Sequence, residues 1–271
     1  MCTSFAAYYG KPLYGMNFDF PKVDIKVTIE KPAQVKFICF YIYVFNKYSP
    51  LVGMNEHGNF VNLQELHLDD AVVNSTDSNS ANKIDGLELF FDYLNERITI
   101  AELMATDCNT QLLLPENYKI HNLFADPNGQ ATIVEGINGK LLQQKISAHQ
   151  LVMTNFAHAL HPDRSTLDLH YIGAERYLTA YRLIEKARHS LDITKAMAIL
   201  KNTFQTSGDY PTQCSWVFDP RAQEIYFRLA ENIDCIWKLS LLDETIEKTG
   251  NKNTSPIKIG DAGVIITKTQ L

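Results

Sequence analysis

The sequence predicts a layered α+β fold in which pairs of helices pack outside antiparallel sheets. Segments rich in Val, Ile, Phe and Tyr occur in three groups, and a pair of segments with helical spacing separates each group from the next. Tight-turn signals join neighbouring strand segments, which favours antiparallel pairing. Such runs of strands and helix pairs are typical of layered domains. No Pro-, Gly- or Ser-rich linker divides the 271 residues, so we expect a single domain, 1–271.

The first twenty residues predict a β-hairpin. Two strands flank Gly10-Lys11, and Gly suits the first central position of a two-residue turn. A hairpin centred between these two residues pairs positions that sum to 21, so we expect Cys2 opposite Asp19. Pro12 lacks the N–H that would close the tightest turn, but a wider loop with the same centre keeps this pairing.

Strand-forming residues recur along the rest of the chain, between clusters of turn residues. The strands predicted in this way are Val23–Glu30, Val35–Tyr48, Leu51–Met54, Asn59–Leu66, Tyr118–Ala125, Ala131–Glu135, Leu141–Ile146, Gln150–Asn155, Cys214–Phe218, Glu224–Leu229 and Cys235–Leu241. We expect Ser49-Pro50 to end a strand, because proline cannot donate to a ladder. The polar stretches Asp69–Asn82 and Thr249–Pro256 are expected to be loops.

Four segments have apolar residues at helical spacing. They are Leu87–Glu96, Thr99–Thr106, Ala174–Arg188 and Ile193–Thr206. Thr99 is followed three residues later by Glu102, which is the pattern of a capping box. The connection from His158 to His170 is irregular. His158 and His161 have the spacing of metal ligands, but no third ligand accompanies them, so we expect solvated histidines and no metal site.

Composition excludes several classes of function. The formal net charge of −6 gives no electrostatic reason to bind nucleic acid or an anionic membrane. Five cysteines are scattered without a CxxC pair, which indicates neither a disulfide framework nor a zinc site and favours a reducing compartment. The N-terminus has no basic segment followed by a long apolar core, so no signal peptide is expected. We therefore expect a cytoplasmic protein without a cofactor.

Cys2 gains a specific chemistry if Met1 is removed, as is common before a small second residue. Cys2 would then carry a thiol and a free α-amine, whose reference pKa values are about 8.5 and about 7.7–8. A nucleophile and a base suited to proton transfer near neutral pH would lie in one residue. A carboxylate across the hairpin, Asp19, could orient the pair and hold the ammonium. The alternative is a hairpin with a chance cysteine at position 2.

Several segments in the same order resemble one family. The chain resembles the N-terminal-nucleophile (Ntn) cysteine amidases of the choloylglycine hydrolase family, the linear amide C–N hydrolases that include conjugated bile acid hydrolases and penicillin V acylases. The segments that carry the resemblance are Met1-Cys2-Thr3, Tyr14–Asp19 (the family's Gly-Arg-Asn-x-Asp), Gly53–Gly58 (Gly-Met-Asn-Glu-x-Gly), Ala125–Glu135 (Asp-x-x-Gly and a Val/Ile-Glu strand), Val152–Asn155 (Leu-Thr-Asn) and Ala174–Tyr177 (Ser-Arg-Phe). The likeness extends from residue 1 to about residue 240.

The resemblance implies a four-layer αββα sandwich, the Ntn-hydrolase fold, and a set of roles. Cys2 is implied as the nucleophile and its amine as the base. Asp19 hydrogen-bonds this unit. Asn155 offers a side-chain N–H to the oxyanion, and Arg176 is a polar organiser near the nucleophile. The implied reaction is attack of the Cys2 sulfur on a linear amide, release of the amine, and hydrolysis of the thioester.

The chain also departs from the family pattern. The usual Arg is Met16 here, and strict alternation in the predicted hairpin places this side chain on the face away from Cys2. A second oxyanion residue, usually Asn, aligns on Lys83 with Asn82 adjacent. The connection from Asn155 to Arg176 lacks the long excursion that helps family tetramers assemble. A homo-oligomer therefore stays open, and neither bile salts nor penicillin V is assigned as the substrate.

The sequence therefore predicts a cysteine amidase that hydrolyses a small-molecule N-acyl amide with an apolar acyl part. Two alternatives remain. A catalytically silent relative would bind an acyl ligand without cleaving it, which the residues at positions 16 and 83 motivate. An acyltransferase would pass the same thioester to an amine instead of to water.

Overall fold

The computed structural model describes residues 1–32, 35–68, 82–107, 110–113, 119–137, 140–146, 148–161, 167–250 and 255–268. Within these residues, two eight-stranded antiparallel sheets have the orders β12-β1-β2-β13-β14-β15-β16-β17 and β11-β10-β9-β6-β5-β4-β3-β18. A parallel pair, β7-β8, lies apart from both sheets. The strands are β1 (Cys2–Ala7), β2 (Leu13–Asp19), β3 (Ile25–Glu30), β4 (Phe37–Val44), β5 (Lys47–Asn55), β6 (Phe60–Glu65), β7 (Lys83–Asp85), β8 (Gln111–Leu113), β9 (Ile120–Ala125), β10 (Ala131–Ile137), β11 (Lys140–Lys145), β12 (Gln150–Met153), β13 (Thr212–Asp219), β14 (Glu224–Leu229), β15 (Trp237–Ser240), β16 (Thr245–Lys248), β17 (Ile257–Lys258) and β18 (Val264–Ile265). The helices are α1 (Gly86–Leu94), α2 (Ile100–Ala105), α3 (Ala174–Ala187) and α4 (Ile193–Asn202), with short 3₁₀ turns η2 (His158–Leu160) and η4 (Ala230–Asn232).

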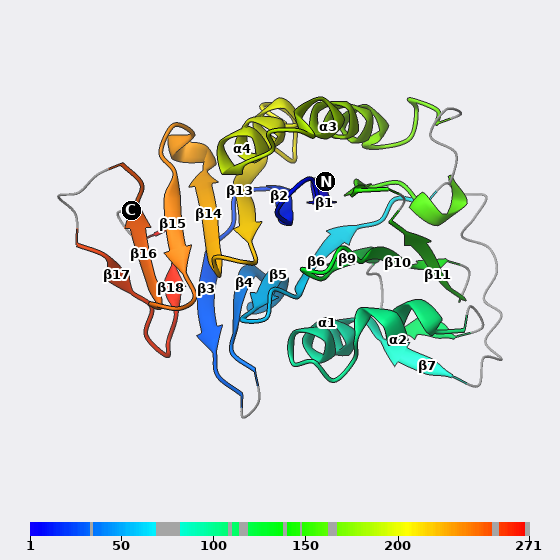
Figure 1. The fold of residues 1–271 in the computed structure, drawn as a ribbon, viewed down its shortest axis with the longest axis horizontal. Helices are drawn as coiled ribbons and strands as arrows, with labels where there is room; N and C mark the ends of the chain where they lie inside the picture. Colours follow the sequence, from blue (N-terminus) through cyan, green and yellow to red (C-terminus); the bar gives the residue numbers. More distant parts are fainter. Residues whose placement is uncertain are drawn as a thin grey trace.

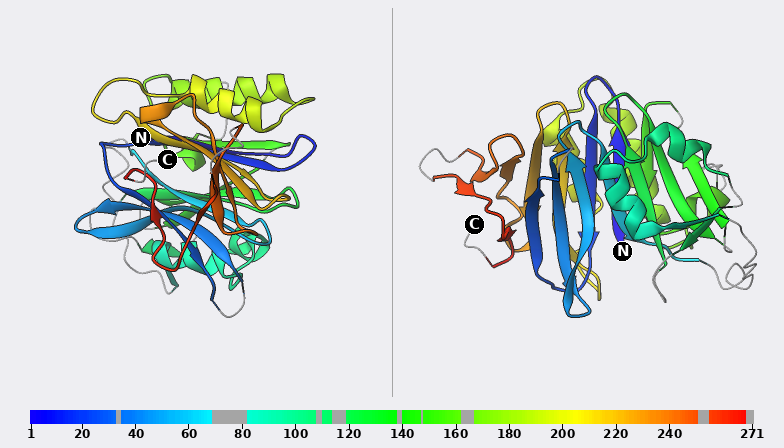
Figure 2. Two further views of the ribbon diagram at one scale, coloured as in Figure 1. Left: turned by 90° about the vertical axis from the view of Figure 1, so that its left-hand side faces the viewer. Right: turned by 90° about the horizontal axis from the view of Figure 1, so that it is seen from below.

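The sheets and helices form the predicted four layers. Helices α3 and α4 cover the outer face of the first sheet, and α1 and α2 cover the outer face of the second (Figure 1). Figure 2 shows the two sheets stacked between these helix layers. Buried apolar residues fill the interface between the two sheets and the interface between each sheet and its helices. Phe40 and Trp216 lie between the sheets, Tyr177 of α3 packs toward the first sheet, and Phe90 of α1 packs toward the second. The αββα sandwich is therefore confirmed, whereas the single domain stays a prediction.

The first hairpin is formed, but its predicted register is wrong by one residue. Cys2 pairs with Phe18, so facing positions sum to 20 and not to 21. The loop spans five residues, from Tyr8 to Pro12, and is centred on Gly10, whose φ is 89°. The missing N–H of Pro12 excludes the two-residue turn, and Gly10 supplies the left-handed conformation at the centre of the wider loop.

The Ser49-Pro50 break is also wrong. Strand β5 runs through Pro50, and the chain reverses earlier, at Phe45 and Asn46, where both φ values are positive. The pairing of β4 with β5 shifts its register next to Pro50, and the described pairing of β5 with β6 begins only at Val52. Proline is tolerated there because no neighbouring ladder needs its N–H. The reversal contains no Gly, so the sequence carries no clear turn signal for it.

The predicted helices are present, and their ends follow local chemistry. The capping box at Thr99 is formed in full, with Glu102 accepting from the Thr99 nitrogen. Helix α4 ends at Asn202, four residues before the predicted end. The expected loop at Asp69–Asn82 lies outside the described residues except for Asn82, and residues 251–254 of the expected polar loop at Thr249–Pro256 lie outside them too. No helix among the described residues is long and apolar enough to cross a membrane.

Candidate active site

Cys2 begins β1, a strand in the interior of the first sheet between β12 and β2. Met1 continues this strand, because its ammonium donates to the Asp19 carbonyl (2.7 Å) and its carbonyl accepts from the Asp19 nitrogen (2.9 Å). The Cys2 side chain points between the sheets and is 4% exposed. Asp19, the predicted partner of Cys2, therefore lies beside Met1 in the ladder, one position beyond the observed partner, Phe18.

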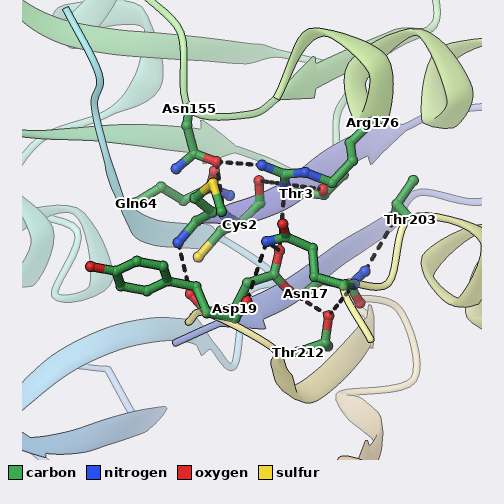
Figure 3. Close-up of polar contacts among 12 residues, drawn as sticks. Cys2, Thr3, Asn17, Asp19, Gln64, Asn155, Arg176, Thr203 and Thr212 are labelled. Atoms are coloured by element: carbon green, nitrogen blue, oxygen red, sulfur yellow. Dashed lines mark hydrogen bonds and ion pairs between the residues drawn. The ribbon is translucent and has the colours of Figure 1, made fainter. Parts of the chain in front are cut away.

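Asn155 reaches Cys2 from the neighbouring strand. It follows the end of β12, and its Oδ1 accepts from the Cys2 nitrogen at 2.9 Å. Its Nδ2 donates to the Glu65 carbonyl at 2.8 Å, and its own carbonyl accepts from the His67 nitrogen at 2.6 Å. The amide of Asn155 is thus fixed from both ends, with its oxygen directed at the nitrogen of the candidate nucleophile (Figure 3).

Arg176 lies in the first turn of α3 and contacts the other three candidate residues. Its Nη1 donates to the Cys2 carbonyl and to Thr3 Oγ1 (2.8 Å), and it lies 3.5 Å from Asp19 Oδ2. Its Nη2 donates to Asn155 Oδ1 at 2.8 Å. The four residues predicted for catalysis, Cys2, Asp19, Asn155 and Arg176, therefore lie in one connected network (Figure 3).

The start of α3 approaches the end of β12 closely, which places Arg176 over the sheet. Gly173 precedes the helix with a φ of 91°, and a Cβ there would lie 2.9 Å from the Thr154 Cβ. Glycine removes both the left-handed strain and this overlap. The close contact between helix and strand is what lets the Arg176 guanidinium reach Asn155.

Asp19 is held by two residues that the sequence did not mark as functional. Thr212 Oγ1 donates to Asp19 Oδ1 at 2.6 Å, and Gln205 Nε2 donates to Asp19 Oδ2 at 3.0 Å. Both lie on the segment between α4 and the start of β13, nearly two hundred residues along the chain. Thr and Gln are ordinary loop residues, so no local pattern could have found them.

Burial dominates the electrostatics of this network. It raises the pKa of the Cys2 thiol to about 11, although the nearby N-terminal ammonium opposes the shift. Burial also raises the pKa of Asp19, opposed by the Arg176 guanidinium, and it lowers the pKa of Arg176. In the chain that carries Met1, the thiol is therefore protonated at neutral pH, and a protonated thiol is a poor nucleophile.

Met16 shares a face with Cys2, so the expectation that it points away is wrong. The register of the hairpin pairs Met16 with Ser4, and all three side chains lie between the sheets. Met16 is fully buried, and its Sδ lies 3.5 Å from Asn62 Nδ2. No bulge is needed, because the one-residue change of register moves every side chain of β2 to the other face.

The structure does not bring Asn82 and Lys83 to Cys2. Both are exposed, and Lys83 begins β7, which lies with α1 and α2 beyond the second sheet (Figure 1). Cys2 is separated from this layer by the second sheet. Sequence alignment alone could not show this, because residues 69–81 precede the pair without a pattern that fixes their path.

A pocket of about 480 Å³ adjoins Met1 and Arg176 on the helix side of the first sheet. The start of α3 and the segment after α4 form its walls, and its polar lining includes His170, Glu175 and Gln205.

In the described part of the chain, no three His, Cys, Asp or Glu side chains gather as metal ligands would. His158 is buried, contrary to the expectation of a solvated loop residue.

Comparison with solved structures identifies the fold. A mutant of conjugated bile acid hydrolase from Clostridium perfringens superposes with a TM-score of 0.69 at 15% identity, over 95% of this chain and 99% of that one. Penicillin V acylase from Agrobacterium tumefaciens gives a TM-score of 0.66 at 15% identity, over 89% of this chain and 86% of that one. The chain has the Ntn-hydrolase fold.

A third solved structure is also similar to this chain. An ortholog of N-acylethanolamine-hydrolyzing acid amidase from Caenorhabditis elegans gives a TM-score of 0.56 at 16% identity, over 81% of this chain and 93% of that one. No protein-family model matches the sequence, and no curated protein does. The resemblance predicted from short motifs is therefore confirmed as a likeness in fold.

Proposed function

We propose that this chain is an N-terminal cysteine amidase of the choloylglycine hydrolase family, which hydrolyses a linear amide through a thioester on Cys2. The observation that carries the proposal is the 2.9 Å contact between Asn155 Oδ1 and the Cys2 nitrogen. Once Met1 is removed, this nitrogen becomes a free α-amine that already has its acceptor in place. The similar solved structures support the proposal, because they are named as hydrolases or acylases of amide compounds.

The reaction uses groups of the network in two steps. The α-amine of Cys2 takes the thiol proton, the sulfur bonds to the amide carbonyl carbon, and the C–N bond breaks as the proton passes to the leaving amine. Water then adds to the thioester with the amine as base, which releases the carboxylic acid and restores the thiol. Arg176 and Asp19 hold the backbone and the charge around Cys2 during both steps.

Asn155 also has a role in binding the oxyanion under this proposal. An amide nitrogen carries two N–H groups, and one of them donates to the Glu65 carbonyl. The second is the donor that we assign to the tetrahedral intermediate. A donor placed in advance of the reaction is worth about 3–4 kcal/mol of barrier. Neither Asn82 nor Lys83 shares this role, because neither reaches Cys2.

An apolar acyl group fits the surroundings of the sulfur. Cys2 faces the core between the sheets with Met16 and Phe18, neither of which offers a charge to a substrate. We assign neither a bile salt nor penicillin V.

The four described cysteines are free thiols, which fits a reducing compartment such as the cytoplasm.

The test compares two buried cysteines in protein confirmed by mass spectrometry to begin at Cys2. Cys2 and Cys214 flank the same residue of β2, Phe18, and share the core between the sheets. Across a panel of N-acyl amides of varied acyl length, C2A should abolish turnover and thioester formation, whereas C214A should keep both. Turnover by C2A, or a purified protein that retains Met1 entirely, would contradict the mechanism.

Binding without turnover is the second candidate function, and the environment of Cys2 favours it. Cys2 is nearly inaccessible, and its raised pKa leaves the thiol protonated. A ligand that binds to the Met1-free protein without any product would support this alternative and exclude the amidase. Product analysis with an added amine separates hydrolysis from acyl transfer, since both pass through the same thioester.

A further inference from the structure

A buried carboxylate of the second sheet holds the segment that follows Asn155. Glu135 lies on β10 and is fully buried. Its Oε1 accepts from the His158 nitrogen at 2.9 Å, and its Oε2 accepts from the Ala159 nitrogen at 2.8 Å. His121 Nδ1 lies 2.9 Å from Oε1. The carboxylate thus connects the second sheet to backbone groups three and four residues beyond Asn155.

Contacts within residues 154–158 also hold this segment together. His158 Nε2 accepts from the Thr154 nitrogen at 2.9 Å, and the Phe156 ring lies 4.0 Å from the His158 ring. On the other side, the Asn155 carbonyl accepts from the His67 nitrogen. Asn155 therefore lies in a short turn whose far end is bonded to Glu135.

Stability alone is a poor account of this arrangement. Burying a charge costs several kcal/mol even when the charge is paired, and apolar replacements of buried pairs are often neutral or stabilising. Glu135 stays charged at this depth, because the neighbouring His121 and His158 hold its pKa below the usual range despite the burial. Hydrogen bonds from backbone N–H groups to a charged oxygen are short, strong and directional, which suits a device that fixes geometry.

We propose that Glu135 is a positioning residue that acts through residues 156–159 to hold the Asn155 amide against Cys2 and Arg176. The kinetic part of this proposal rests on the amidase function proposed above. The positioning itself does not, and it can be measured on protein without turnover.

The first measurement is structural. Glu135→Gln should speed hydrogen exchange at the His158 and Ala159 amides and shift the NMR signal of the Asn155 side-chain amide. The matched control is Thr132→Val, since Thr132 is buried on the same strand but bonds to the Gln144 carbonyl of β11. Thr132→Val should leave all three signals unchanged. Unchanged signals in Glu135→Gln, or equal changes in both variants, would overturn the proposal.

The second measurement is a double-mutant cycle on kcat. Misplacing a catalytic group by about 1 Å can cost about 100-fold in rate, so Glu135→Gln should lower kcat to this extent with KM little changed. In the Asn155→Ala background, Glu135→Gln should add no further loss, because its effect passes through Asn155. Losses that multiply would overturn the proposal.

A second variant covers the case in which Glu135→Gln does not fold. Glu135→Asp keeps the charge beside His121 but withdraws the oxygens from the two backbone N–H groups. It should reproduce the faster exchange at His158 and Ala159. If wild type beginning at Cys2 hydrolyses no amide, the proposed function fails, and the exchange data still decide whether Glu135 positions Asn155.

Discussion

Replacing Arg176 by Met isolates the contribution of the buried network to stability. The Arg176 side chain is 13% exposed and that of Asp19 is fully buried. Removing one partner of such a pair leaves an uncompensated buried charge, which costs about 3–5 kcal/mol. In a chain of this size, 1 kcal/mol shifts the melting temperature by about 2–4 °C, so R176M should melt about 6–20 °C lower.

Two further variants complete this measurement. Arg188 lies just after the end of α3, and its partner Glu185 is also well exposed, so R188M should change the free energy of unfolding by less than about 1 kcal/mol. The double variant R176M/D19N should recover part of the loss from R176M, because it removes the uncompensated buried charge as well. The assay is urea unfolding with melting temperatures in parallel. A loss in R176M no larger than that in R188M, or no recovery in the double variant, would contradict the assigned cost of the buried charge.

Other predictions concern the thiol, the carboxylate and the start of α3. In protein that retains Met1, the rate at which Cys2 reacts with an alkylating reagent should rise with pH toward about 11. After removal of Met1 the rate should level off at a clearly lower pH, because the α-ammonium then lies on Cys2 itself and favours the thiolate. Identical profiles would contradict this effect of the ammonium. Asp19 has a raised pKa in the folded state, so its contribution to stability is complete below its unfolded pKa of about 3.8 and is lost as pH rises through the folded pKa. Over that pH window, wild type should therefore lose stability relative to D19N. Unfolding curves measured across the acid range would show this loss. Gly173→Ala should destabilise the chain by about 1–3 kcal/mol, since it combines a left-handed φ with overlap on Thr154, and unchanged stability would show that the helix start can shift freely.

Some motif residues that resemble the family serve the fold and not the site. At the end of β5, Asn55 Oδ1 accepts from the nitrogens of His57 and Asn59 in the following turn, and its Nδ2 donates to the Leu94 carbonyl of α1. On β2, Asn17 Nδ2 donates to the Leu200 carbonyl of α4. Each of these asparagines fixes a helix layer to a sheet. This explains why short motifs could predict the architecture.

Cys2 and Asp19 were predicted for catalysis from the first hairpin, whereas Asn155 and Arg176 were predicted only from the family resemblance. Cys2 follows the first Met and Asp19 ends β2, while Asn155 follows the end of β12 and Arg176 stands in the first turn of α3. Gln205 and Thr212 have no such signal, because they contact Asp19 from far along the chain and such contacts leave no periodic pattern. Glu135 belongs to one of the motifs that carry the resemblance, but only the structure shows which groups it contacts.

The sequence by itself determined the layers of this protein, since strand and helix periodicity and turn chemistry are local properties of the chain. It also determined which residue could serve as a nucleophile with its own base. The tertiary structure decided the register of the first hairpin, and with it the face of Met16, because a shift of one residue exchanges the two faces of a strand. It also decided that Lys83 lies far from the site and that Cys2 is buried. Depth of burial and distance between remote segments depend on packing, which no local pattern encodes.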